Sequence, residues 1–147
     1  TINVLQAVIL TNKEKIILTP TYHVMEMYNV HQDAMLVPID IKTDNYTFGN
    51  ESLPAVSGSA SKDSTGLIHV SLTNINPGKE EAVAVKIDGK KYNKVSGRIV
   101  TSKKLQDHNT FEEPDKIIPQ VFNGASLKGN VLNVKLPPFS VVVLELK

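Results

Sequence analysis

Short apolar runs, separated by turn-forming residues, dominate the chain beyond residue 35. Within each run, apolar and polar residues alternate or Val, Ile and Leu follow one another, as is typical of β-strands. The breaks between the runs are rich in Gly, Pro, Asn and Asp, which favour turns. The runs cover residues 34–40, 66–75, 81–87, 95–101, 130–136 and 140–147. Six or more short strands at this spacing predict a mainly β fold, an antiparallel sandwich.

Two segments of this region have a particular expected role. The last run, "SVVVLELK", has almost no polar face before Glu145, so we expect a strand that is buried on both sides. The longest irregular segment, residues 104–124, exceeds the ordinary length of a connection. We therefore expect a long loop that packs over the sandwich or against another surface.

The first 35 residues carry a different pattern. Apolar residues at helical spacing in "TINVLQAVIL" predict a helix, "TNKEK" is a polar connection, and "KIILT" predicts a short strand. Pro20 fits the first turn of a second helix, with Thr19 as its N-cap. The apolar face of that helix consists of Val24, Met27, Tyr28 and His31. The order αβα is typical of α/β folds, in which the strands are parallel.

Charge and hydropathy argue against two kinds of partner. The 16 basic and 15 acidic side chains leave a net charge of +1. A nucleic-acid-binding protein usually has a basic face with stacking aromatic residues, and the sequence shows no such face. No stretch contains the roughly 20 apolar residues that a membrane span needs. We therefore expect neither nucleic acid nor a membrane among the partners.

Composition also bounds the size and the chemistry of the protein. A chain of 147 residues is long enough for one domain with one main core. The absence of cysteine excludes disulfides and thiol catalysis, yet it fits the cytoplasm and the periplasm of a bacterium alike. The chain begins inside an apolar run without an N-cap signal, so we expect a cut through a longer protein.

Several stretches resemble the C-terminal part of family 51 glycoside hydrolases, the α-L-arabinofuranosidases. They cover nearly the whole chain in order, and those at residues 19–34 and 136–146 are the most specific. The stretches are "NVLQAVILT", "KIILTPTYHVMEMYNVHQDA", "LPAVSGSASKD", "IHVSLTNINP", "VSGRIVTS", "HNTFEEPDKIIPQ" and "LPPFSVVVLEL". In that family a (β/α)8 barrel precedes a jelly-roll β-sandwich. The resemblance thus implies that residues 1–35 end the barrel, with "KIILT" as its eighth strand, and that residues 36–147 form the sandwich.

The resemblance also implies an activity for the longer protein. Family members are retaining, exo-acting enzymes that release terminal arabinofuranose from arabinan or arabinoxylan, and a retaining enzyme needs two carboxylates. Both are Glu on earlier barrel strands, one of them after an Asn. The only Asn-Glu here, Asn50-Glu51, falls in a turn-rich stretch. We therefore expect no catalytic glutamate in this segment, no activity from it alone, and no cofactor.

The barrel assignment points to three candidate sugar contacts, because barrel active sites form at the carboxyl ends of the strands. Thr19, Thr21 and Tyr22 follow "KIIL" directly, and His23 comes next. For Thr19 the alternative role is that of the helix cap. For Tyr22 and His23 the alternative is a place on the rim of the site.

Two other groups of residues have side chains that can bind metals. Asp107, Glu112, Glu113 and Asp115 lack the alternating spacing of a calcium cage, and a solvated loop is the alternative. The histidines at positions 31, 69 and 108 share no zinc-ligand spacing. We expect His31 to be a hydrogen-bonded histidine on the buried helix face.

A carbohydrate-binding module is the rival function, because such modules often bind polysaccharide on exposed aromatic residues. The chain has no Trp, and Tyr22 and Tyr28 belong to the predicted helix, while Phe139 precedes the last strand and is expected in the core. The other aromatic residues are scattered over separate loops or strand ends; they are Tyr46, Phe48, Tyr92, Phe111 and Phe122. The favoured function is a support for the catalytic barrel of the same longer chain. The sandwich could also contact a second copy of the chain in a homo-oligomer.

Overall fold

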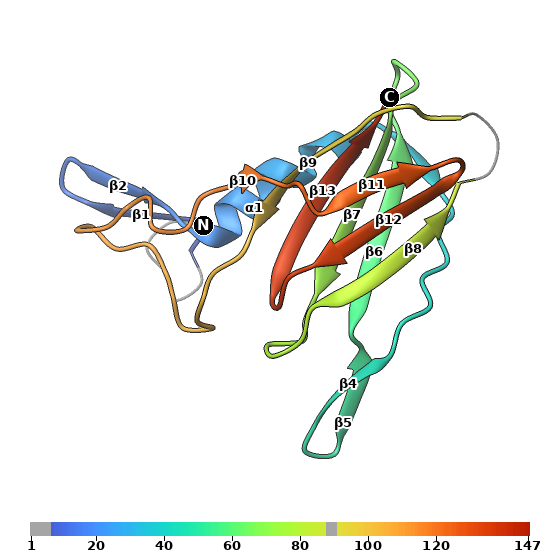
Figure 1. Cartoon of the computed structure of the whole chain (residues 1–147). Helices are drawn as coiled ribbons and strands as arrows, with labels where there is room; N and C mark the ends of the chain where they lie inside the picture. Colours follow the sequence, from blue (N-terminus) through green and yellow to red (C-terminus); the bar gives the residue numbers. More distant parts are fainter. Residues whose placement is uncertain (1–6, 88–90) are drawn as a thin grey trace.

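Two antiparallel sheets packed face to face form the body of the protein (Figure 1). The computed structural model describes residues 7–87 and 91–147. The larger sheet has the strand order β10-β9-β13-β7-β6-β3 and the smaller one the order β11-β12-β8. In chain order the strands of the larger sheet are β3 (Met35–Val37), β6 (Val56–Lys62), β7 (Ile68–Asn74), β9 (Val95–Val100), β10 (Gln120–Val121) and β13 (Ser140–Leu146). Those of the smaller sheet are β8 (Glu81–Lys86), β11 (Ala125–Lys128) and β12 (Val131–Leu136). The predicted mainly β antiparallel sandwich is confirmed.

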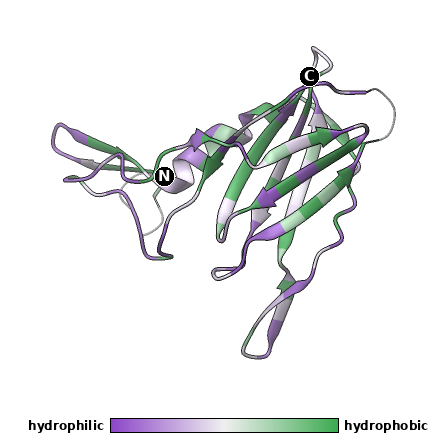
Figure 2. Ribbon diagram, in the orientation of Figure 1, coloured by the Kyte–Doolittle hydropathy of each residue, from purple (hydrophilic) through white to green (hydrophobic). Residues whose placement is uncertain are grey.

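The main core lies between the two sheets and is built by alternation along the strands. Hydrophobic residues are concentrated in the strands of both sheets (Figure 2). Leu72 of β7, Leu132 of β12 and Leu144 of β13 are fully buried, and all three belong to one cluster. Each of the six predicted runs contains one strand of the two sheets. In chain order these strands are β3, β7, β8, β9, β12 and β13.

The last strand, β13, is buried on both faces, as its sequence predicts. It pairs with β7 on one side and with β9 on the other. Val142, Leu144 and Leu146 join the core between the sheets. Val143, on the opposite face, is only 8% exposed and lies in a second cluster outside the sandwich.

That second cluster is made by the helix α1 (Pro20–Tyr28). Met27, 2% exposed, packs with Val100, Ile117 and Val143, and α1 contacts β9 and β13. A 3-10 turn, Asn29–His31, continues the helix. The predicted helix and its buried face are thus confirmed. Within the described part of the chain, no helix is long and apolar enough to cross a membrane.

The predicted αβα order at the front of the chain is wrong where the structure describes it. Residues 1–6 of the first predicted helix lie outside the described residues, but Ile9 and Leu10 belong to a strand, β1 (Ile9–Asn12). This strand pairs antiparallel with β2 (Lys15–Leu18), which is the predicted strand "KIIL". The polar connection is a tight turn in which Lys13 has a left-handed φ of 53°. Apolar β-branched residues on both sides of such a turn favour a hairpin over a helix.

Several strands lie outside the predicted runs. β6 contains three Ser and one Gly, so its sequence lacks a hydrophobic alternation. Gly58 allows its close contact with β7, because a Cβ there would lie 2.7 Å from the carbonyl oxygen of Ser71. β11 and β4 (Asn45–Phe48) occupy stretches that the sequence predicts as breaks, and β5 (Glu51–Pro54), which forms a hairpin with β4, lies outside every predicted run. This hairpin projects from one end of the sandwich (Figure 1).

Candidate functional site

The junction between β2 and α1 contains the three predicted sugar contacts. Thr19 has an extended backbone and caps α1, because its Oγ1 accepts a hydrogen bond from the Tyr22 amide at 3.4 Å. The same hydroxyl donates its proton towards two carbonyl oxygens, that of Ala7 at 3.0 Å and that of Val8 at 2.9 Å. The hydroxyl of Thr19 is therefore engaged within the chain, which supports the capping role.

Thr21 and Tyr22 are more accessible than Thr19. Thr21 is exposed on the first turn of α1 and lines a hollow of about 330 Å³ together with Ser102, Lys104 and Asp107. Tyr22 is half-buried, and its ring lies edge-on to that of His23 at 5.6 Å. The structure thus brings the candidates into one helical turn, with the side chain of Thr21 facing a hollow.

Charged groups surround this turn. Burial lowers the pKa of His23, and the charge of Arg98 lowers it further, while the carboxylates of Glu26 and Asp115 act in the opposite direction. Glu26 accepts a hydrogen bond from Arg98 at 2.8 Å, and this bond lowers the pKa of the Glu26 carboxyl. The pair joins α1 to β9.

The long loop between β9 and β10 runs alongside the β1–β2 hairpin (Figure 1). It contains no helix or strand from Thr101 to Pro119, so the predicted long loop is confirmed that far, but the predicted range 104–124 also includes the short strand β10 at residues 120–121. Asn109, 4% exposed, donates from Nδ2 to the carbonyl oxygen of Leu18 at 2.8 Å and to that of Ile117 at 3.0 Å. Its Oδ1 accepts from the amide of Ile117 at 2.7 Å. No sequence signal distinguishes Asn109 from its polar neighbours, and the prediction missed it.

The acidic residues of this loop do not converge. Asp107 bonds the hydroxyl of Ser102 and pairs with Lys116 at 3.1 Å, and these contacts lower the pKa of its carboxyl. Glu112, Glu113 and Asp115 are exposed. Within residues 7–87 and 91–147, no three His, Asp or Glu side chains are close enough to hold a metal.

Two of the histidines have defined polar partners beneath α1. His31 is half-buried, with Nδ1 2.7 Å from the Ser61 hydroxyl and Nε2 3.1 Å from that of Ser71, so it is hydrogen-bonded as predicted. His69, in β7, donates from Nε2 to Asp63 at 2.8 Å. Hydrogen bonds from Thr65 and His69 hold the pKa of the Asp63 carboxyl far below its usual range. The contacts of His31 join the 3-10 turn after α1 to β6 and β7, and the His69–Asp63 pair joins β7 to the turn that precedes it.

Glu51 and the aromatic side chains lie elsewhere. Glu51 begins β5 and is exposed on the projecting hairpin. Tyr46 and Phe48 alternate along the neighbouring strand β4 and therefore share one of its faces. Phe122 is 8% exposed and belongs to the main core. Tyr46 and Phe48 on the projecting hairpin and Phe122 in the main core thus lie in different parts of the fold.

Comparison with known proteins decides the family. The family of α-L-arabinofuranosidase C-terminal domains matches residues 1–140. The chain belongs to this family. It is 40% identical, over 99% of its length, to an intracellular exo-α-L-arabinofuranosidase of Bacteroides ovatus. Its structure superimposes on a GH51 arabinofuranosidase of Xanthomonas axonopodis pv. citri with a TM-score of 0.97, at 39% identity and over 100% of the chain.

These relatives are much longer than the chain. It spans 29% of the Bacteroides protein and 30% of the Xanthomonas protein. An α-L-arabinofuranosidase of Thermotoga maritima, whose structure was solved with arabinose, shares the fold of 99% of the chain at a TM-score of 0.82 and 21% identity. The chain covers 32% of that protein. The described fold is therefore also found in longer arabinofuranosidases, of which the chain covers about a third.

Proposed function

We propose that the chain is the non-catalytic C-terminal segment of a retaining, exo-acting α-L-arabinofuranosidase. The observation that carries this proposal is the identity of about two fifths with arabinofuranosidases along the whole chain, over less than a third of their length. The longer protein would release terminal arabinofuranose from arabinan or arabinoxylan. The name of the Bacteroides relative favours an intracellular enzyme over a periplasmic one.

In this proposal residues 1–35 complete the catalytic barrel and residues 36–147 support it. Thr19, Thr21 and Tyr22 would border the sugar, with Thr21 the best placed because its side chain faces a hollow. Large apolar side chains are exposed on the segments around this junction, as expected of a surface that a catalytic barrel covers. They are Ile16 on β2, Met25 on α1 and Leu105 on the long loop, each more than half exposed.

The proposal is tested with an aryl α-L-arabinofuranoside as substrate. We expect the purified segment to be inactive and the longer protein that carries it to be active, because a retaining mechanism needs two closely spaced carboxylates. Glu51→Gln in the longer protein should leave the rate unchanged. Turnover by the segment that disappears on Glu51→Gln would place a catalytic carboxylate on the projecting hairpin and overturn the proposal.

A further inference from the structure

The smaller sheet ends in a strand with an open backbone edge. β8 is the last strand in the order β11-β12-β8, so among the described residues only its edge to β12 is paired. The amide of Ile87, just after β8, donates to the carbonyl oxygen of Asn130 at 2.8 Å. Because alternate residues of an antiparallel strand face opposite edges, the amide of Val85 also faces β12. The amides of Ala82 and Ala84, called the edge amides below, point to the open edge, and both residues are exposed.

A hollow runs along this open edge and reaches the main core. Its volume is about 830 Å³. Four residues of the larger sheet line it, and each is at most 9% exposed; they are Ala60, Ile68, Val70 and Leu146. A second hollow, of about 340 Å³, shares Lys42 with the first and extends to Glu81 and Ala82 at the start of β8. The edge of the sandwich is therefore not closed beside β8.

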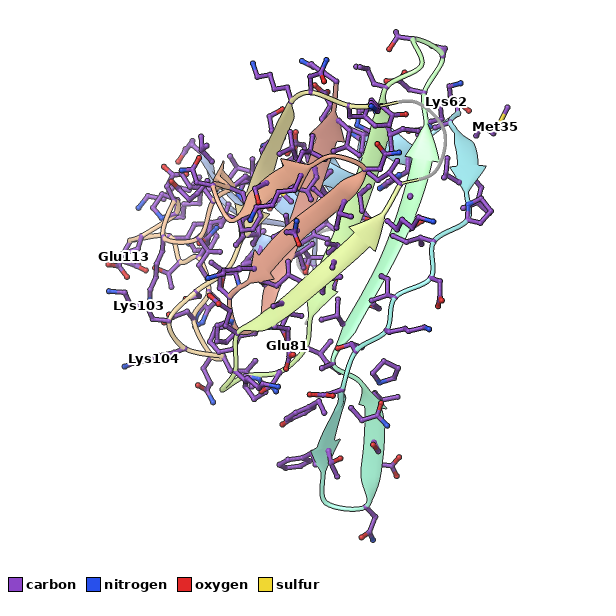
Figure 3. All side chains as sticks on the ribbon, turned by 45° about the vertical axis from the view of Figure 1, so that its right-hand side comes forward. Met35, Lys62, Glu81, Lys103, Lys104 and Glu113 are labelled. Atoms are coloured by element: carbon purple, nitrogen blue, oxygen red, sulfur yellow. The ribbon has the colours of Figure 1, made fainter. Side chains whose placement is uncertain are left out.

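The other side of the hollows is formed by residues 38–44, which alternate like a strand although they contain no helix or strand. Ile39 and Ile41 are half-buried and pack against the main core. Asp40 and Lys42 are exposed. Figure 3 shows this stretch running from β3 down the side of the sandwich toward the projecting hairpin. Two stretches with the alternation of strands, β8 and residues 38–44, thus flank the hollows.

We infer that a β-strand from another part of the longer protein enters the hollows and pairs with β8. The open edge supplies backbone donors and acceptors, and the apolar floor receives every second side chain, which is how an extended peptide binds by strand addition. Left unpaired, an edge beside an apolar hollow is an aggregation hazard. This inference rests on the proposed function, because the strand comes from the part of the arabinofuranosidase that lies outside this chain.

A strand of the same longer protein fits the hollows better than a second copy of the chain or a small ligand. The chain spans 29% and 30% of two relatives, so more than two thirds of their length lies outside it. A tethered strand has a high effective concentration. Each strand that the structure describes already belongs to a sheet, so a second copy has no spare strand. A small ligand would leave the edge amides unpaired. The added strand should alternate apolar and polar residues, with the apolar ones facing Val70 and Leu146.

Hydrogen exchange in the longer protein tests this inference without reference to activity. The edge amides are compared with those of Val83 and Val85, which bond β12 in either case. With the added strand every amide of β8 is hydrogen-bonded, so we expect the edge amides to exchange at most about tenfold faster than their two neighbours. A larger difference, with protection at every second residue only, overturns the inference. Protection that appears only when the protein dimerises at high concentration assigns the edge to a second copy and also overturns it.

A proline variant distinguishes a paired strand from a surface that only covers the edge. In Ala84→Pro we expect exchange at Ala82 to become at least about tenfold faster, because a strand paired on both sides loses a hydrogen bond. Ala125→Pro is the matched control, since Ala125 begins β11, the opposite edge strand of the same sheet. There, exchange at Ala82 should stay within about twofold of the wild type.

Unchanged exchange at Ala82 in Ala84→Pro overturns the inference, because no strand is then paired with that edge. If Ala84→Pro fails to fold, exchange of the edge amides in the unmodified protein still decides. The absence of arabinofuranosidase activity in the unmodified longer protein overturns the proposed function instead, whatever the exchange of β8.

Discussion

At the scale of single residues, three polar side chains fix the front of the chain: Thr19 by contacts within the front, and His31 and Asn109 by contacts with the sandwich and its long loop. Thr19 holds the carbonyls before β1, His31 bridges two strands of the larger sheet, and Asn109 holds the end of β2. The roles of Thr19 and His31 were predictable, because an N-cap and a polar residue on a buried helix face have sequence signatures. The role of Asn109 was not, because a contact across 91 positions leaves no local pattern.

The cap at Thr19 makes a testable contribution to stability. Thr19→Ala removes the acceptor for the Tyr22 amide and should lower the free energy of unfolding of this chain by about 1–2 kcal/mol. Thr19→Ser should recover most of that loss. Thr21→Ala is the control, since Thr21 is exposed, and should stay within about 0.5 kcal/mol of the wild type. Equal losses for Thr19→Ala and Thr21→Ala in urea unfolding would contradict the capping role.

His31 should make the stability depend on pH. Burial, and next the charge of His69, lower its pKa below the ordinary value of 6.5. Below about pH 6.5 the unfolded chain therefore binds more protons than the folded one, and the free energy of unfolding falls as the pH falls. Urea unfolding at pH 7 and pH 5 should show a smaller difference in His31→Gln than in the wild type. The exposed His108 is the control, and His108→Gln should keep the wild-type difference.

At the scale of elements, the predictable part is the part with a clear hydrophobic period. The helix α1 and the strands β7, β8, β12 and β13 follow their patterns because their side chains fill a core. β6 was not predicted because Gly58 and Ala60 on its core face are small, while its other face carries Ser57, Ser59 and Ser61. β1 was mistaken for helix because its spacing is ambiguous over so few residues and the turn at Lys13 decides the pairing. The strands that the sequence did not predict are those defined by pairing with a neighbouring strand. Such pairing leaves no pattern within the strand's own sequence.

The central strand β13 should be indispensable. Truncation after Pro138 removes the partner of both β7 and β9 together with three core side chains, so we expect no soluble, cooperatively folded product. Leu144→Ala should cost about 2–5 kcal/mol, because Leu144 is fully buried. Leu53→Ala on the projecting hairpin, where Leu53 is 61% exposed, should cost less than about 0.5 kcal/mol. A truncated chain with an unchanged thermal melt would show that β13 is peripheral.

At the scale of the whole molecule, the front of the chain is not an independent appendage. α1 covers the outer face of the larger sheet, and the long loop returns to the end of β2. The opposite surfaces of β2, α1 and the loop carry exposed Ile16, Met25 and Leu105. One set of elements thus has a face on the sandwich and a face available to another partner, as expected where a supporting domain joins a catalytic one.

The central claim is that this segment completes and supports the catalytic part of an arabinofuranosidase. The most direct measurement is to produce the part of the longer protein that precedes Thr1, alone and together with this chain, and to compare activity on an aryl α-L-arabinofuranoside and the thermal midpoint. We predict that the preceding part is inactive or unfolded alone and regains both activity and a raised midpoint with the segment. Full activity and an unchanged midpoint without the segment would contradict the account.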